Sequence, residues 1–125
     1  MLIDTDVIIW YMRGNTSARD ALQRIEPFAL PAATYMELVQ GMRNRKELAS
    51  LEKALEKWRA TVLPIKESLS NTAVALVKHF FLSHSLQLAD ALIAGTALES
   101  GSVLFTANDK HYRMVDGLNL KIFRP

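Results

Sequence analysis

Short apolar segments alternate with longer amphipathic segments along the whole chain, and this alternation restricts the fold more than any other sequence feature. We expect strands within residues 1–4, 27–34, 61–65, 102–109 and 120–123. The segments between them carry apolar residues at helical spacing. Strands separated by helices form a parallel sheet with helices on both faces. The sequence therefore predicts an α/β three-layer sandwich with a mainly parallel sheet of four to five strands.

The helices have recognisable ends. They are expected at residues 5–14, 16–26, 35–44, 45–60, 67–83 and 88–100. Thr5 or Asp6 is a suitable N-cap for the first helix and Ser17 for the second, because their oxygens accept hydrogen bonds from free backbone N–H groups. Gly101 is expected to end the last helix.

Length and composition fit one globular domain, residues 1–125. Half of the residues are hydrophobic, and the absence of cysteine excludes disulfides and thiolate chemistry. No apolar run reaches the roughly 18 residues of a membrane span, and Asp4 and Asp6 interrupt the place of a signal peptide's apolar segment. We expect a soluble, cytoplasmic protein with no membrane partner. The net charge of +2 permits a phosphate-bearing partner without indicating one.

Acidic residues follow several of the predicted strands. Asp4 and Asp6 come after the first strand, Glu37 after the second and Asp109 after the fourth, while Asp90 stands among apolar residues near the start of a predicted helix. The carboxyl ends of parallel strands lie at one edge of the sheet, where α/β proteins bind their ligands. We therefore expect these acids to converge at that edge.

Each acid also has a structural interpretation when taken alone. Asp4 or Asp6 can cap a helix, Glu37 can form a capping box with Thr34, and Asp109 suits a turn. Together, however, the charges would repel, by about 4 kcal/mol for two carboxylates about 4 Å apart at an effective dielectric constant near 20. Either some of them are protonated or a cation lies between them.

The donor types decide which cation suits such a site. Carboxylate oxygens, with no cysteine and no histidine at ligand spacing, favour Mg²⁺ or Mn²⁺ over zinc. A carboxylate cage that leaves coordination sites for water and phosphate oxygens suits metal-assisted hydrolysis of phosphodiesters.

Four blocks of the sequence resemble, in order, the signature blocks of the PIN domain family, and more narrowly those of VapC-type toxins from toxin–antitoxin pairs. They are LIDTDVII, AATYMELVQG, LADALIAGTAL and LFTANDKHY followed by GLNL. Each block alone is unspecific, but the ordered set spans essentially the whole chain. The resemblance implies a magnesium-dependent endoribonuclease with an RNA substrate, inhibited by a cognate VapB-like antitoxin and usually a homodimer.

The resemblance also assigns residues position by position. The catalytic set that it implies is Asp4, Glu37, Asp90 and Asp109, and the metal ligands would be Asp4, Asp90 and Asp109. Asp6 falls where the family often has asparagine, so it matches a polar position. Thr5 and Thr106 would orient the acids.

The fourth acidic position departs from the family pattern. Counting from Thr106, the family's Asn or Asp falls on Asn108, and Asp109 lies just beyond it. We expect Asp109 to supply the charge and Asn108 a hydrogen bond. His111 follows in the same turn and is expected to be a surface residue.

RNA binding requires cations near the acids, because backbone phosphates supply much of the affinity. Arg13, Arg43 and Lys110 are the candidates.

Two other interpretations remain open. Asp4 and Asp6 also resemble the Asp-x-Asp of haloacid-dehalogenase-like phosphatases, in which the first aspartate is phosphorylated. Alternatively, the chain is a non-catalytic PIN-like RNA-binding domain. Both enzyme interpretations require Mg²⁺, whereas the binding domain does not.

Overall fold

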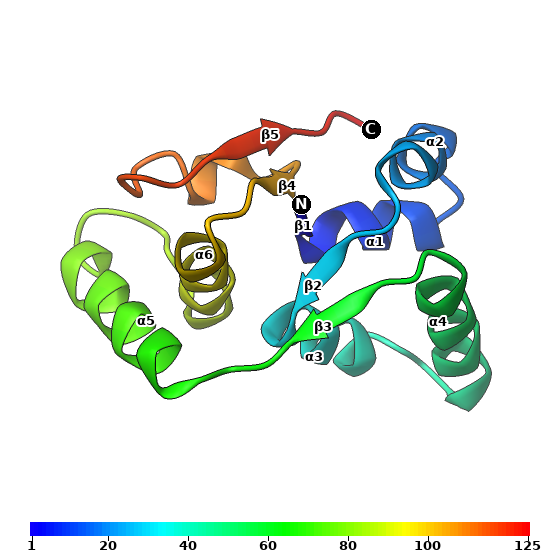
Figure 1. Cartoon of the computed structure of the whole chain (residues 1–125), viewed down its shortest axis with the longest axis horizontal. Helices are drawn as coiled ribbons and strands as arrows, with labels where there is room; N and C mark the ends of the chain where they lie inside the picture. The colour runs from blue at the N-terminus through cyan, green and yellow to red at the C-terminus, as the bar shows by residue number, and fades with distance from the viewer.

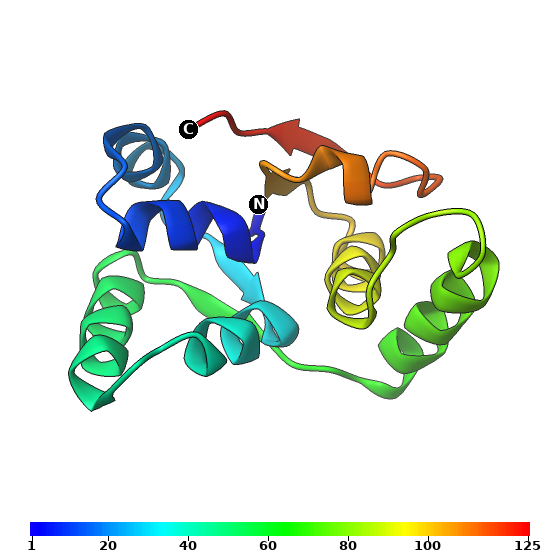
Figure 2. The same cartoon turned by 180° about the vertical axis from the view of Figure 1, so that it is seen from behind.

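The computed structural model describes residues 1–125 and contains a five-stranded sheet with helices on both faces (Figures 1 and 2). The strands are β1 (Leu2–Ile3), β2 (Ala29–Pro31), β3 (Thr61–Leu63), β4 (Leu104–Thr106) and β5 (Leu120–Ile122). Their order is β3-β2-β1-β4-β5, and all four pairings are parallel. The predicted fold class and the fifth strand are confirmed.

The helices occupy the predicted segments. They are α1 (Thr5–Met12), α2 (Thr16–Ile25), α3 (Ala32–Gln40), α4 (Arg45–Lys57), α5 (Glu67–Phe80) and α6 (Leu88–Ser100), with a short 3₁₀ helix η1 (Asp109–His111). The start of α3 lies three residues earlier than expected, because Pro31 ends β2 and serves as the N-cap of the helix. None of the helices combines the length and the apolar character needed to span a membrane.

Successive residues of the central strands belong to different cores. Ile3 and Phe105 are paired in register and belong to the core that contains residues of α1, α2 and α4. Leu2 and Leu104 are also paired, and they pack with Ile93 of α6. This alternation is the two-residue period of a strand buried on both faces. Helix α5 packs on α6, through Ala73 and other residues.

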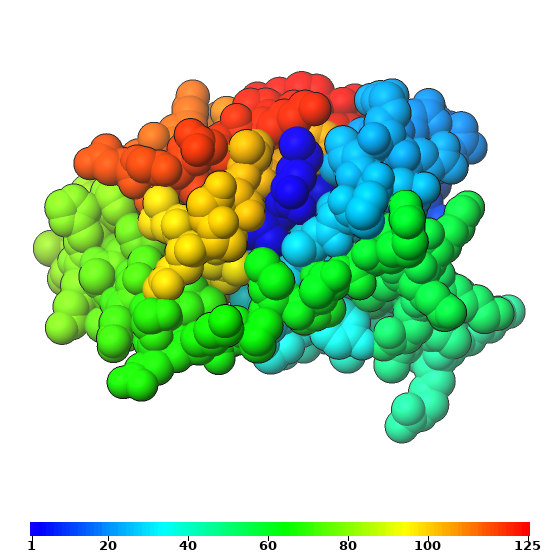
Figure 3. Space-filling model, viewed as in Figure 1, coloured from blue at the N-terminus to red at the C-terminus, as the bar shows by residue number.

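The first strand lies in the middle of the sheet, between β2 and β4. The space-filling view shows the dark blue N-terminal residues enclosed between the light blue segment of β2 and the yellow and orange segments of α6 and β4 (Figure 3). The residues that follow β1 therefore emerge at the centre of the sheet's carboxyl edge. In Figure 2, the starts of α1, α3 and α6 and the segment η1 are arranged around this central region.

The helix caps differ in part from the prediction. Asp4, and neither Thr5 nor Asp6, is the N-cap of α1, because Thr5 is already the first residue of the helix. Asn15 caps α2 in place of Ser17. Gly101 ends α6 in the left-handed region at φ 63°, as predicted, a conformation in which the absence of Cβ avoids steric strain.

Candidate active site at the carboxyl edge of the sheet

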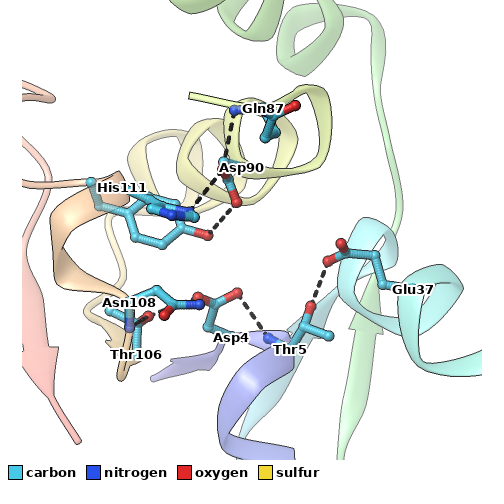
Figure 4. A network of polar contacts seen from close by, with 9 residues as sticks. Asp4, Thr5, Glu37, Gln87, Asp90, Thr106, Asn108 and His111 are labelled. Carbon is cyan, nitrogen blue, oxygen red and sulfur yellow. Dashed lines mark hydrogen bonds and ion pairs between the residues drawn. The ribbon is translucent and has the colours of Figure 1, made fainter. Parts of the chain in front are cut away.

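Asp4 is the centre of the polar network at the carboxyl edge (Figure 4). Its side chain is only 4% exposed. Oδ1 accepts a hydrogen bond of 2.8 Å from the Thr5 backbone N–H, and Oδ2 accepts one of 2.7 Å from Thr106 Oγ1. Burial and the nearby charge of Asp6 raise the pKa of Asp4 from 3.8 to about 7. The carboxylate is therefore held in place but is costly to ionise.

Asp6 is the second acid on the first turn of α1. Its Oδ2 accepts a hydrogen bond of 3.0 Å from the Ala107 N–H, which follows β4. Its Oδ1 is buried and has no hydrogen-bond partner. Burial also raises the pKa of Asp6. An unpartnered buried carboxylate oxygen is uncommon in folded proteins and calls for a ligand or a cation.

Glu37 reaches the network from α3. The Thr5 hydroxyl donates a hydrogen bond of 2.6 Å to Glu37 Oε1, and Thr5 Oγ1 also contacts Thr34 Oγ1 at 3.3 Å. Since the N-cap of α3 is Pro31, Glu37 does not form the capping box with Thr34 that its spacing allows. Thr5 thus connects Asp4, through its backbone, with Glu37, through its side chain.

Asp90 enters from the first turn of α6 and is held by three donors. Its Oδ2 accepts from the Gln87 N–H at 3.1 Å and lies 3.1 Å from His111 Nδ1. Its Oδ1 accepts from the Tyr112 hydroxyl at 3.3 Å. In Figure 4, Asp90 and His111 lie on one side of Asp4, and Thr5 and Glu37 lie on the other.

Tyr112 is a site residue that the sequence analysis missed, and His111 is one that it assigned only to the surface. Tyr112 is 1% exposed, and its hydroxyl, besides donating to Asp90, lowers the pKa of Asp4. Burial and the negative charges of Asp4 and Asp90 raise the pKa of Tyr112, so the hydroxyl remains a donor. His111 was expected to be a surface residue, and its side chain is 38% exposed, but its ring also lies 3.1 Å from Asp90 Oδ2. The only sequence feature that could have indicated Tyr112 is that a large aromatic residue stands in an otherwise polar turn.

Asp109 is directed toward arginines instead of toward the other acids. Arg124 Nη2 donates to Asp109 Oδ1 at 3.0 Å, and Arg113 Nε lies 3.9 Å from Oδ2. The hydrogen bond from Arg124 lowers the pKa of Asp109. Asn108 lies on the loop that carries the site, and its backbone N–H donates to Thr106 Oγ1 at 2.9 Å.

The three predicted RNA-binding cations differ in their surroundings. Arg13 and Arg43 line a hollow of about 450 Å³ that also contains Glu37. Arg43 is paired with Glu47 at 2.7 Å, and Arg13 lies over the Trp10 ring. Lys110 is exposed on η1.

The donors at the carboxyl edge fit a hard divalent cation in chemical type. They are oxygens, one of them is buried without a partner, and no ion pair of the structure includes Asp4, Asp6 or Glu37. As they stand, however, no three acidic or histidine side chains are arranged to hold a metal ion together. Binding of a cation would therefore require at least one of these acids to move.

Comparison with known proteins identifies the family of the chain. Residues 1–118 match the PIN domain family. Ribonuclease VapC10 of Mycobacterium tuberculosis is 33% identical over 122 residues, which cover 94% of this chain and 90% of that protein. Ribonuclease VapC19 of the same organism is 30% identical over 122 residues, which cover 94% of this chain and 95% of that protein.

Solved structures show the same fold. A chain of the toxin–antitoxin complex from Klebsiella pneumoniae superposes with a TM-score of 0.78 and 27% identity, covering 94% of this chain and 93% of that one. VapBC2 from Rickettsia felis, solved with a DNA fragment from its promoter, superposes with a TM-score of 0.83 at 16% identity, covering 98% of each chain. The family match and the identity to two VapC ribonucleases lead to one conclusion: the chain belongs to the PIN domain family, among its VapC-type members.

Proposed function

We propose that this protein is a divalent-metal-dependent endoribonuclease that acts as the toxin of a toxin–antitoxin pair. The observation that carries the proposal is the pair of buried Asp4 and partly buried Asp6, in which the buried Asp6 Oδ1 has no hydrogen-bond partner and neither acid forms an ion pair. The relatives named ribonuclease support RNA as the substrate. The cytoplasm, where RNA substrates are abundant, is the proposed location.

The site residues have distinct roles in this proposal. Asp4 and Asp90 would hold Mg²⁺ or Mn²⁺. When bound, such an ion supplies a hydroxide-like water at neutral pH and compensates charge on the phosphate. Glu37, oriented by the Thr5 hydroxyl, would accept a proton from the attacking water. The hydrogen bond from Thr106 lowers the pKa of Asp4 and so favours its charged form.

At the fourth position, Asn108 is a better candidate than Asp109. The Asp109 carboxylate is engaged by Arg124 and Arg113, whereas Asn108 lies next to the loop residue that binds Asp6. We therefore expect Asp109→Asn to reduce cleavage no more than Arg124→Gln does, since both remove the same ion pair. A loss for Asp109→Asn that matches the loss for Asp4→Asn would instead place Asp109 among the metal ligands.

The complexes among the structural relatives support a protein partner. The chain from Klebsiella pneumoniae comes from a toxin–antitoxin complex. We propose that a cognate VapB-like antitoxin inhibits this protein. From the family resemblance, we also propose a homodimer.

The decisive experiment compares the wild-type chain with Asp4→Asn, Glu37→Gln and Asp90→Asn in expression cultures and as purified proteins. Asp116→Asn, an exposed aspartate without an ion pair, is the matched control. We expect discrete new RNA ends that depend on Mg²⁺ or Mn²⁺ and disappear with a chelator. Loss of the general base should slow cleavage by about 10²–10⁴-fold, and both aspartate variants should be at least as impaired.

Other outcomes would identify the alternatives. Metal-independent RNA binding without cleavage would indicate a non-catalytic domain. Hydrolysis of a phosphomonoester with an acyl-phosphate on Asp4 would indicate the phosphatase. The phosphatase interpretation explains neither why Glu37 contacts Thr5 nor why Asp90 accepts a hydrogen bond from the Tyr112 hydroxyl.

A further inference from the structure

A second hollow lies on the other flank of the site, between α2 and β5. Its volume is about 310 Å³, and its lining includes Arg24 from α2, Lys121 from β5 and Arg124 after β5. Figure 1 shows the chain running from β5 toward α2, and in Figure 3 the red surface of this segment meets the blue surface of α2. We call this hollow the α2–β5 groove.

The groove has a surplus of positive charge. Arg24 and Lys121 are exposed, and neither forms an ion pair. Its acidic residue, Asp20, is already paired with Arg19 at 3.2 Å. Lys121 Nζ lies 5.7 Å from the centre of the Phe105 ring, a cation–π contact that places the amine over the groove. An anionic ligand would therefore meet unopposed cations here.

Arg124 connects this groove to the active site. Its Nη1 donates to the Ala107 carbonyl at 3.0 Å, and its Nη2 donates to Asp109 at 3.0 Å. The N–H of the same Ala107 binds Asp6. With both nitrogens engaged, the guanidinium is oriented before any ligand binds, although the side chain is still 64% exposed. One end of the groove, at Arg124, is thus connected to Asp6 through the single residue Ala107.

Cations consequently flank the acids on both sides. The hollow with Arg13 and Arg43 lies at Glu37, on the helix that follows β2, whereas Arg124 follows β5. In the sheet, β2 and β5 are separated by β1 and β4. Three strand spacings of about 4.8 Å separate β2 from β5 by roughly 14 Å, a span that an extended polyanion can cross.

We propose that the α2–β5 groove binds backbone phosphates of the RNA on one side of the scissile bond, so that the strand crosses the acids from the Arg13–Arg43 hollow to this groove. The inference rests on the proposed ribonuclease function, because it assigns the path of that enzyme's substrate. Arg24 and Lys121 would act on affinity, not on the chemical step, since they lie in the groove away from the acids. Phosphate contacts of this kind carry the salt dependence of binding.

Binding is tested first, without cleavage. In the Asp4→Asn background, a single-stranded RNA of about 20 nucleotides is titrated at several salt concentrations. We expect Arg24→Gln with Lys121→Gln to weaken binding roughly 10-fold and to reduce the slope of log affinity against log salt by about one to two. Lys53→Gln with Lys57→Gln removes the same charge from α4 and should change neither quantity. Equal behaviour of the two double variants would overturn the proposal.

Cleavage then locates the contact on the strand. In the otherwise wild-type enzyme, the groove double variant should raise KM about 10-fold with a much smaller change in kcat. Shortening the RNA from one end should abolish the difference in KM between the wild type and the groove double variant. Shortening it from the other end should preserve that difference. If the wild type cleaves no RNA, the proposed function fails, whereas the binding titration still decides the groove. Weaker binding of a protein partner with unchanged RNA affinity would assign the groove to that partner and overturn the RNA path.

Discussion

Thr106 and Asp4 are 102 positions apart in the chain, yet the Thr106 hydroxyl donates a hydrogen bond of 2.7 Å to Asp4 Oδ2. The bond exists because β1 and β4 are neighbours in the sheet and end at the same edge. It stabilises the charged form of a carboxylate that burial disfavours. The strand pairing and the ionisation of the site are therefore coupled.

Thr106→Val should raise the pKa of Asp4 further. Valine has nearly the same shape but no hydroxyl, so the charged form of Asp4 loses a donor while the buried packing is kept. The measurement is an NMR pH titration of the Asp4 carboxyl carbon in the metal-free protein. Thr96→Val, which removes another buried hydroxyl from α6, serves as the control. An unchanged Asp4 titration would show that the hydrogen bond does not act on ionisation.

Asp4→Asn should change how stability depends on pH in the metal-free protein. The pKa of Asp4 is about 7 in the folded chain and 3.8 without burial, so the folded state binds more protons between these values. The wild-type free energy of unfolding should therefore fall as pH rises from about 4 to about 7. Asparagine removes this contribution, and the variant should be more stable than wild type at pH 8.

Urea unfolding at pH 5 and pH 8 with a chelator present measures this effect, and Asp116→Asn should retain the wild-type dependence. Addition of Mn²⁺ should stabilise the wild type more than the Asp4→Asn variant, because an ion that binds the folded state stabilises it by mass action. A wild type that gains stability between pH 5 and pH 8 without metal would contradict the raised pKa.

Tyr112→Phe should impair cleavage while leaving the chain folded. The ring still fills the core beside Leu2 and Leu104, but Asp90 loses one of its three donors. Partners of this kind around metal ligands typically contribute about 10–100-fold in affinity or activity. Steady-state cleavage and Mn²⁺ titration measure both quantities. Tyr35→Phe, which removes an exposed hydroxyl that donates to Glu52, is the matched control, and equal effects of the two variants would exclude a role for Tyr112.

Gly95→Ala should destabilise the contact between α5 and α6. A Cβ at residue 95 would lie 2.7 Å from Leu69 Cδ1, so the leucine would have to move within a packed interface. Overpacking of this kind costs about 1–3 kcal/mol. Gly41→Ala, where the added Cβ meets its nearest atom at 3.5 Å, should have a much smaller effect. Thermal unfolding of both variants distinguishes the two sites.

The order of strands and helices was predictable because it depends on local patterns. Apolar runs of a few residues, separated by helical periodicity, allow only a parallel sheet with helices on both faces. Connectivity then sends Asp4, Glu37 and Asn108 to the same edge, whatever the details of packing. The end of α6 at Gly101 was predictable for the same reason, because a left-handed helix end needs no distant partner.

The partners of each acid were not predictable from these patterns. Asp109 has the same local setting as Asn108, yet it turns to Arg124 because β5 brings that arginine beside the loop. Tyr112 and His111 reach Asp90 only because η1 folds back against the start of α6. The sequence by itself determined which strand ends share an edge, since periodicity and chain connectivity are local properties. The tertiary structure alone decided which side chains meet there, because side-chain contacts depend on elements that are distant along the chain.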